Sequence, residues 1–462
     1  MTAPLRALAA CVAAGVAVAM LALVVPLRAT GGDTVPGRYG AAVFACRGGF
    51  DLREVDWIAA AAAAGHRPYY VLLAKDGALV SMYGPAPALL GAPFLESLDP
   101  GTMLSDRDLA ARARLGAALS VGLAIALLAG ALCARIAARY ATLLALAVGA
   151  SFAGAGTLGQ APWQQTALLV PLTAAIATIA WARWREGVLL VATPALLVVA
   201  FFVRPAASLL LLALGATWVL AWRDCKREKR DKRDKRDPAW LAGAAALAIV
   251  LALPQAAWSV QHWGRLLPTG QLTSTAASMS DGRVFELRPV AVATALAGLL
   301  ASPARGALLF APLLLVALWA AIRSGDRPAR ILAAGVVAHF VLIAVWRDWW
   351  GGLTFGPRLL AEALWVAPWM LARAWPIEGR GARAVLAASA VVTAAVGLLG
   401  ALRYDAAWDI RRDPDQHHEA LWDLRDSPLA AAVRGEHASA IDAPSGPYAY
   451  CLARALERPS RR

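Results

Sequence analysis

A series of apolar runs, each about long enough to cross a lipid bilayer, constrains the fold of this chain more than any other feature. The first extends over residues 5–27 and the last over 384–402. Because an α-helix needs ~20 mainly apolar residues to cross the hydrocarbon core, these runs predict membrane spans. Hydrophobic residues make up 59% of the 462 positions and the mean hydropathy is +0.56. Such values are typical of an integral membrane protein and not of a soluble domain.

We expect an all-α polytopic membrane protein with about eleven transmembrane helices. The first run is not followed by a good small-x-small cleavage site, so it is interpreted as an uncleaved signal anchor with a cytoplasmic N-terminus. Residues 1–402 then form one transmembrane domain, and 403–462 form a polar tail. The expected spans are 5–27, 112–134, 141–159, 164–182, 188–203, 205–222, 239–258, 304–322, 331–346, 357–375 and 384–402.

Basic residues gather in alternate short loops, and the positive-inside rule places these loops in the cytoplasm. The longest is the charged loop 223–238, RDCKREKRDKRDKRDP. It is interpreted as a solvated linker, with attraction to anionic lipid headgroups as the alternative. The formal net charge of +14 therefore reflects topology, and no nucleic-acid partner is expected. The same assignment places a large first loop at 28–111, a loop at 259–303 and the C-terminus on the outer face.

One polar segment interrupts the apolar sequence at residues 346–360, WRDWWGGLTFGPRLL. Tryptophan favours the headgroup zone of a membrane, and glycine lets a backbone approach a ligand closely. Arg347 and Arg358 offer forked donors suited to phosphate. The segment is therefore either a wall of a binding site or a tryptophan-anchored loop at the membrane surface.

Three further charged residues lie where expected spans meet the outer face, namely Asp33, Arg204 and Arg305. Charged groups at a membrane boundary are costly, so they are functional candidates when they do not serve as anchors. Asp33 is either a catalytic carboxylate or a turn residue in GGDT. Arg204 either extends to the headgroups or binds an anion inside the bundle. Arg305, at the start of a span, either binds phosphate at a helix N-terminus or anchors the boundary.

Motifs of nucleotide hydrolysis and of serine hydrolysis are missing from the sequence, which contains no P-loop, no GxSxG and no HExxH. The histidines lack metal-ligand spacing. His339, inside an expected span, is interpreted as a packed core residue, or as a proton carrier if the chain is a transporter. Cys46 and Cys451 are both expected outside, where disulfides persist, and we predict that they pair and hold the tail against the first loop.

Eight short motifs follow one another along most of the chain. They are GDTVP at 32–36, LVSMYGPAPALLGAPF at 79–94, APWQQTALL at 161–169, VRPAA at 203–207, LLPTG at 266–270, SPARGALLFAP at 302–312, WWGGLTFGPRLLAEAL at 349–364 and ALWDLRDSPL at 420–429. Taken in this order, the motifs resemble the GT-C superfamily of integral-membrane glycosyltransferases. In plan the chain is similar to protein O-mannosyltransferases and to the aminoarabinose transferases of lipid A.

The resemblance implies transfer of a sugar from a polyprenyl-phosphate donor to a lipid, glycan or protein acceptor at the outer face of a bacterial-type cytoplasmic membrane. It implies a first-loop carboxylate as the base, and Asp33 in GDTVP fits that position. Many members carry an acidic pair there, whereas Asp33 is followed by Thr34. A bound divalent metal is therefore kept as an alternative, and no cofactor is assigned. The first alternative is a transporter or flippase of a lipid-linked sugar or another amphiphile. A further alternative is a non-catalytic membrane scaffold whose outer loops bind a partner.

The remaining roles follow from the same resemblance. The leaving group is a lipid phosphate, so arginines near its developing charge would stabilise the transition state. The expected phosphate and lipid ligands are Arg204, Arg305, Arg347 and Arg358. The residues expected to position the donor or the acceptor are Asp348, Trp349, Trp350, Asp51, Glu54 and Asp56.

Overall fold

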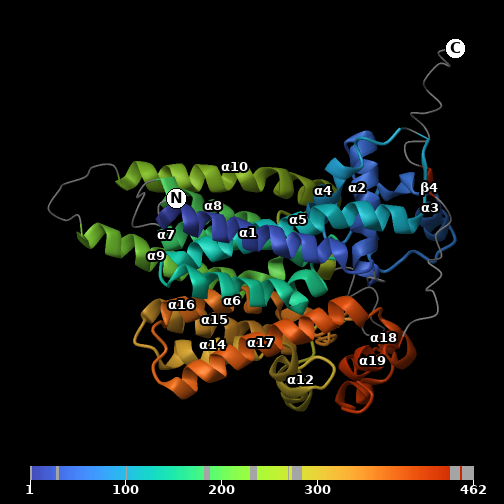
Figure 1. Cartoon of the computed structure of the whole chain (residues 1–462). Helices are drawn as coiled ribbons and strands as arrows, with labels where there is room; N and C mark the ends of the chain where they lie inside the picture. Colours follow the sequence, from blue (N-terminus) through green and yellow to red (C-terminus); the bar gives the residue numbers. More distant parts are fainter. Residues whose placement is uncertain are drawn as a thin grey trace.

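The computed structural model describes residues 3–27, 31–99, 101–181, 188–228, 237–268, 270–272, 283–436 and 448–449. Most of the chain is helical, with long helices lying side by side and shorter elements at one end (Figure 1). Eight helical segments of the described chain are long and apolar enough to cross a membrane, which confirms the prediction of a helical membrane protein at this level. They involve α1 (Ala3–Val24), α5 (Asp106–Cys133), α6 (Ala138–Ala150) with the irregular turn η4 (Phe152–Gly156), α7 (Gln164–Trp181), α9 (Ser208–Glu228), α10 (Asp237–Trp263), α15 (Arg327–Ala344) and α17 (Arg380–Arg403).

Three of the expected spans correspond to helices shorter than 18 residues. They are α8 (Val188–Val203), α14 (Pro312–Arg323) preceded by the single turn α13 (Ala307–Phe310), and α16 (Ala361–Arg373) preceded by η6 (Arg358–Leu360). The expected loop 259–303 contains a further apolar helix, α12 (Pro289–Ala301). Its 13 residues are too few to cross a bilayer by length alone, and no helix was predicted there from the sequence.

Small residues let the long helices pack closely. A Cβ atom added at Gly15 of α1 would lie only 2.5 Å from the carbonyl oxygen of Gly122 in α5, so the two backbones touch. This small-residue contact is typical of helix association in membranes. Figure 1 shows α1, α5, α8 and α10 on one side of the bundle and α14, α15, α16 and α17 on the other.

The first loop folds as a small unit at one end of the bundle. A cluster of buried apolar side chains that includes Tyr39, Leu52 and Ile58 forms its core. The antiparallel hairpin of β1 (Val71–Leu73) and β2 (Leu79–Ser81) contributes Val71 and Leu79 to this core. The other elements are α2 (Val35–Arg47), η2 (Leu52–Glu54), α3 (Asp56–Ala63), α4 (Ala86–Gly91), η3 (Ala92–Phe94) and β3 (Met103–Leu104).

The C-terminal segment returns to the same end of the molecule (Figure 1). It contains α18 (Ala407–Arg412), η7 (His418–Trp422), α19 (Pro428–Arg434) and β4 (Tyr448–Ala449). Strand β4 pairs antiparallel with β3, with Leu104 opposite Tyr448, so the tail contacts the first loop. Cys46 is disulfide-bonded. Its expected partner Cys451 lies outside the described residues, as do 229–236 of the charged loop.

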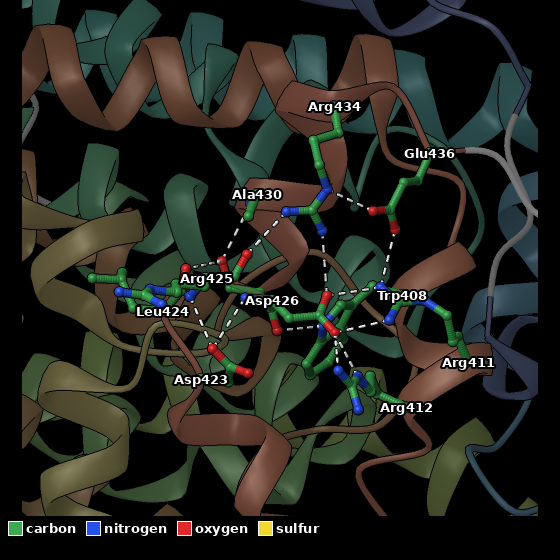
Figure 2. A network of polar contacts seen from close by, with 11 residues as sticks. Trp408, Arg411, Arg412, Asp423, Leu424, Arg425, Asp426, Ala430, Arg434 and Glu436 are labelled. Carbon is green, nitrogen blue, oxygen red and sulfur yellow. Dashed lines mark hydrogen bonds and ion pairs between the residues drawn. The ribbon is translucent and has the colours of Figure 1, made fainter.

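A network of ion pairs holds the C-terminal segment together (Figure 2). Arg411 donates two hydrogen bonds to the carboxylate of Asp426, at 2.8 and 2.7 Å, and Arg412 also pairs with that carboxylate. Trp408 donates its ring N–H to the Asp426 carbonyl at 2.7 Å. Hydrogen bonds from Arg411 hold the pKa of Asp426 well below its ordinary value, as expected for a two-pronged arginine–carboxylate pair. The network joins α18 to the segment around Asp426 and, through Arg434, to the helix that follows it.

Candidate functional site

A cavity of ≈ 820 Å³ is formed where the first loop and the C-terminal segment meet the bundle. Segments far apart in the sequence line it, including residues within 31–33, 82–83, 346–359 and 409–418. More than half of the site residues predicted from the sequence line this one cavity. The predicted residues that line the cavity are Asp33, Arg204, Arg347, Asp348, Trp350 and Arg358.

Asp33 lines the cavity shortly after the end of the first helix in the sequence. It lies on η1 (Gly32–Thr34), a single turn that follows α1. Arg114 of α5 donates hydrogen bonds to the carbonyl of Ala22, in the last turn of α1, and to that of Val25, the residue just after the helix. Carbonyls at a helix C-terminus have no partner within the helix. A buried arginine at this point therefore holds the C-terminal end of α1.

The carboxylate of Asp33 is surrounded by donors. Arg358 Nη2 lies 2.6 Å from Oδ2, and the Tyr69 hydroxyl donates to Oδ1 at 2.7 Å. Tyr83 also lines the cavity, and its side chain helps to lower the pKa of Asp33. Burial raises the pKa of Asp33, but the charge of Arg358 and these hydrogen bonds outweigh burial, so the pKa lies below its ordinary value. Asp33 is therefore a carboxylate at neutral pH.

Arg358 is held by the loop that precedes it. Its Nη2 donates to the Gly351 carbonyl at 2.9 Å, and its guanidinium lies 4.4 Å from the ring centre of Trp163. Gly351, Gly352 and Gly356 have φ angles of +80°, +69° and +81°, values that side chains other than glycine rarely adopt. The three glycines therefore let the loop fold back on Arg358. Among the described residues, the buried Nε of Arg358 has no hydrogen-bond partner.

Arg204 forms the deep end of the cavity, at the junction of α8 and α9. It makes an ion pair with Glu362 of α16, and its Nη1 donates to Gln164 Oε1 at 3.0 Å. Arg204 is 2% exposed and Glu362 is 0% exposed, so both charges lie inside the bundle. His339 Nε2 lies 3.9 Å from Glu362 Oε2 and contacts the carbonyl of Leu359. Within the described chain, Nη2 of Arg204 has no hydrogen-bond partner.

The opposite end of the cavity is acidic. Trp350 donates its ring N–H to Asp415 Oδ1 at 2.7 Å, and the ring of His418 lies 4.6 Å from that of Trp350. Burial, with a further contribution from Asp415, raises the pKa of Asp348 to about 6. Burial also raises the pKa of Asp409 to about 7, in spite of its ion pair with an arginine. Negative charge is therefore crowded at this end.

Arg305 does not line the cavity, although it was expected to bind phosphate. Its guanidinium is 0% exposed and donates to Asp409 at 2.5 Å and to the carbonyls of Trp350 and Gly352, both at 3.0 Å. With its donors engaged in this way, Arg305 braces the wall of the cavity from behind.

Four other candidates also lie away from the cavity lining. Trp349 packs its ring against Gly298 of α12, where an added Cβ would meet the ring at 2.1 Å. Asp51 accepts a hydrogen bond from the amide of its near neighbour Arg53 and so begins η2. Glu54 and Asp56 are exposed on the first loop. These three carboxylates follow Asp33 closely in the sequence but do not line the cavity, because α2 carries the chain away from it.

Several cavity or wall residues were missed by sequence reasoning. Tyr69 and Tyr83 lie on either side of the β-hairpin, and their approach to η1 depends on the fold of the first loop. Glu362 was detectable, because it is the only acidic residue in an expected span and charged residues in spans are functional candidates by default. Asp409 gave no comparable signal, since the C-terminal segment has many acidic residues.

Metal binding has no specific support in this arrangement. Among the residues that the structure describes, no group of three histidine, cysteine, aspartate or glutamate side chains is placed to hold a metal ion. The cavity instead combines one carboxylate held by donors, two buried arginines and an acidic rim. Such a set of groups can bind an anion and accept a proton.

Comparison with known proteins identified no relative of this chain. No known protein family matches the sequence, and no curated protein and no solved structure is significantly similar to it. The function of the chain must therefore be inferred from the geometry of the cavity and from the sequence motifs.

Proposed function

We propose that the chain is a membrane glycosyltransferase with the GT-C plan. It moves a sugar from a polyprenyl-phosphate donor to an acceptor at the outer face of a bacterial-type cytoplasmic membrane. The proposal includes eleven transmembrane helices and a cytoplasmic N-terminus. The observation that carries it is that one cavity contains the carboxylate of Asp33 together with two buried arginines, Arg204 and Arg358.

The arginines are suited to the phosphate of the donor. Each has a buried nitrogen without a hydrogen-bond partner among the described residues, and a buried donor left unpaired is costly. A phosphate oxygen would satisfy both. Glu362 and Gln164 hold Arg204 from behind, so its guanidinium is already oriented before the donor arrives.

Asp33 is suited to act as the base. Donor phosphate would compete with Asp33 for Arg358, and weakening that ion pair would raise the pKa of Asp33 toward its ordinary value. Asp33 then accepts the proton of the acceptor hydroxyl or amine as that group attacks the anomeric carbon. The new bond to the acceptor forms while the bond from the anomeric carbon to the phosphate oxygen breaks, and polyprenyl phosphate leaves with its charge on the two arginines.

The disulfide state of Cys46 supports an outer location of the first loop, because disulfides persist in oxidising compartments. The strand pair between β3 and β4 places the C-terminal tail beside that loop. Both observations support a cavity that opens on the outer side. A donor carried by a lipid can be used there, because it needs no sugar nucleotide.

The test is transfer of labelled sugar from a polyprenyl-phosphate donor by the full chain in proteoliposomes. Asp33→Asn is expected to lower kcat by ~10²–10⁴-fold, because a general base contributes about that much. Donor binding should be retained. Glu54→Gln removes a first-loop carboxylate that lies outside the cavity, so it should transfer at the wild-type rate. Wild-type activity in Asp33→Asn would refute the role of Asp33 as base.

A transporter or flippase is the second candidate, and one observation favours it. Glu362 and His339 extend the polar groups of the cavity into the bundle, both at 0% exposure. Buried ionisable residues within spans often mark a transport path. Movement of a labelled polyprenyl-phosphate lipid across proteoliposomes, with no glycosidic product formed, would favour this function over transfer.

A further inference from the structure

The cavity has ends of opposite charge, and the proposed chemistry uses only one of them. The arginine end lies inside the bundle, whereas the acidic end is built by the C-terminal segment around α18 and η7. Four carboxylates line the acidic end, those of Asp348, Asp409, Asp413 and Asp415. Two arginines supply counter-charge here. Arg305 pairs with Asp409 alone among the four, and Arg347 also lines the cavity and attracts the carboxylate of Asp348, so the carboxylates still outnumber the arginines.

Asp409 distinguishes this end from an ordinary solvated acidic surface. Its side chain is 0% exposed and lines the cavity. Oδ1 accepts the hydrogen bond from Arg305, but Oδ2 has no hydrogen-bond partner among the described residues. A buried carboxylate oxygen is costly to leave unpaired, and here it borders a cavity large enough for a ligand. The unpaired atom therefore points to a missing donor.

The aromatic groups beside the carboxylates narrow the chemistry of that donor. Trp350 and His418 line the acidic end, and Trp350 fixes Asp415 through its ring N–H. Tryptophan faces and carboxylates together attract organic ammonium groups. A metal ion fits less well, because in the described part of the chain no three acidic, histidine or cysteine side chains are placed to bind one.

We propose that this acidic end binds a protonated amine of the acceptor, so that the acceptor of the proposed transferase is an amine-bearing molecule. The inference rests on the proposed function. It assigns the amine to the acceptor because the donor phosphate occupies the arginines deep in the bundle. The acidic end is nearer to water, since Asp415 and His418 are exposed. An acceptor carrying phosphate groups would be repelled here, which makes the proposal specific.

The charge state of the carboxylates is in keeping with a cationic ligand. The pKa of Asp348 is raised to about 6 by burial and by Asp415, and that of Asp409 is raised to about 7 by burial, with Asp415 and Asp413 adding to it. A bound ammonium group would lower both values by favouring the charged carboxylates.

A matched pair of probes tests the inference without knowledge of the natural acceptor. Octyl 6-amino-6-deoxyglucoside and octyl glucoside differ by one amine in place of one hydroxyl. Binding of each is measured calorimetrically to the full chain in nanodiscs of uncharged phosphatidylcholine, with EDTA present. We expect the amine probe to bind about tenfold more tightly, as a partly desolvated charge pair allows. In the double variant Asp413→Asn/Asp415→Asn the preference should fall below about threefold.

Two controls keep the outcomes distinct. Glu419→Gln removes a neighbouring negative charge that does not line the cavity, so it should keep the full amine preference. Asp33→Asn should also keep it, because this variant changes the base and not the acidic end. Equal binding of the two probes by the wild type, or a preference that survives in the Asp413/Asp415 double variant, would overturn the inference. So would amine binding that appears only when Mg²⁺ replaces EDTA.

The failure of this inference can be told apart from failure of the proposed function. Loss of transfer in Asp33→Asn together with equal probe binding overturns the amine-bearing acceptor and leaves the transferase standing. A clear amine preference in a chain that transfers no sugar from any polyprenyl-phosphate donor overturns the transferase, and with it the assignment of the amine to an acceptor.

Discussion

In the proposed reaction, the ion pair between Asp33 and Arg358 would give one guanidinium two functions that exclude each other in part. While Arg358 contacts Asp33 at 2.6 Å, it stabilises the carboxylate and makes it a weak base. When Arg358 turns to a phosphate, the same carboxylate becomes a stronger base. Base strength at Asp33 would therefore rise only after the donor is bound, which limits proton transfer to the complex that is ready to react.

The pair of Arg204 and Glu362 allows stability to be separated from ligand binding. Removing one partner of a buried ion pair leaves an uncompensated charge and costs about 3–5 kcal/mol, whereas replacing both by apolar residues of similar size is often neutral. We expect Glu362→Met to lower the thermal unfolding temperature sharply. The double variant Arg204→Met/Glu362→Met should unfold near the wild-type temperature and yet lose binding of a polyprenyl-phosphate lipid.

The readouts for this prediction are thermal unfolding in detergent and lipid binding by the same purified samples. Glu54→Gln serves as a control, because Glu54 is exposed and lies outside the cavity lining, so this variant should keep both the unfolding temperature and lipid binding. A double variant that binds the lipid as well as the wild type does would show that Arg204 has only a structural role.

At the scale of elements, close backbone contacts decide where the walls of the site stand. Helix α17 lies against the irregular turn η4, and a Cβ at Gly397 would meet Ser151 Cα at 2.3 Å and the Ala150 carbonyl oxygen at 2.5 Å. Backbone atoms cannot move aside as a flexible side chain can. The same turn carries Ala153, whose carbonyl accepts the ring N–H of Trp365 in α16 at 2.8 Å, so a shift here would reach the helix that holds Glu362.

Gly397→Ala is therefore expected to destabilise the chain by ~1–3 kcal/mol, the usual cost of overpacking. Gly381→Ala lies in the same helix, where an added Cβ meets nothing within 4 Å. That variant should change stability by no more than ~0.5 kcal/mol. Thermal unfolding of the two variants in the same detergent provides the measurement. Equal unfolding temperatures would mean that α17 and η4 are not in contact as described.

At the scale of the whole molecule, the sequence predicted the helical membrane plan because long apolar runs leave few other structures open to a chain. Asp33 and Arg358 were found because charged residues stand out at the ends of such runs. Glu54 and Asp56 were misjudged as neighbours of the site because the path of the first loop depends on packing among its own side chains. Asp409 was missed because only the fold brings the C-terminal segment back over the cavity.

The orientation of the molecule is the expectation on which an outer-face reaction depends, and two loops at opposite ends of α15 can test it. Gly325 lies just before α15. Trp350 lies shortly after the other end of this helix, and the ring of His418, next to Glu419 in the sequence, contacts Trp350. The 18 residues of α15 separate them by ~27 Å, about the thickness of the hydrocarbon core.

Single cysteines introduced as Glu419→Cys and Gly325→Cys should therefore face opposite sides of the membrane. The Glu419 side chain is 80% exposed, and an added Cβ at Gly325 meets nothing within 4 Å, so both changes should be tolerated. In a background with Cys11, Cys133 and Cys225 replaced by serine, an impermeant maleimide added to intact spheroplasts should label only Glu419→Cys. Both should react after solubilisation. Labelling of Gly325→Cys alone in intact cells would place the cavity in the cytoplasm, where the Cys46 disulfide would be reduced and an outer-face donor could not reach Asp33.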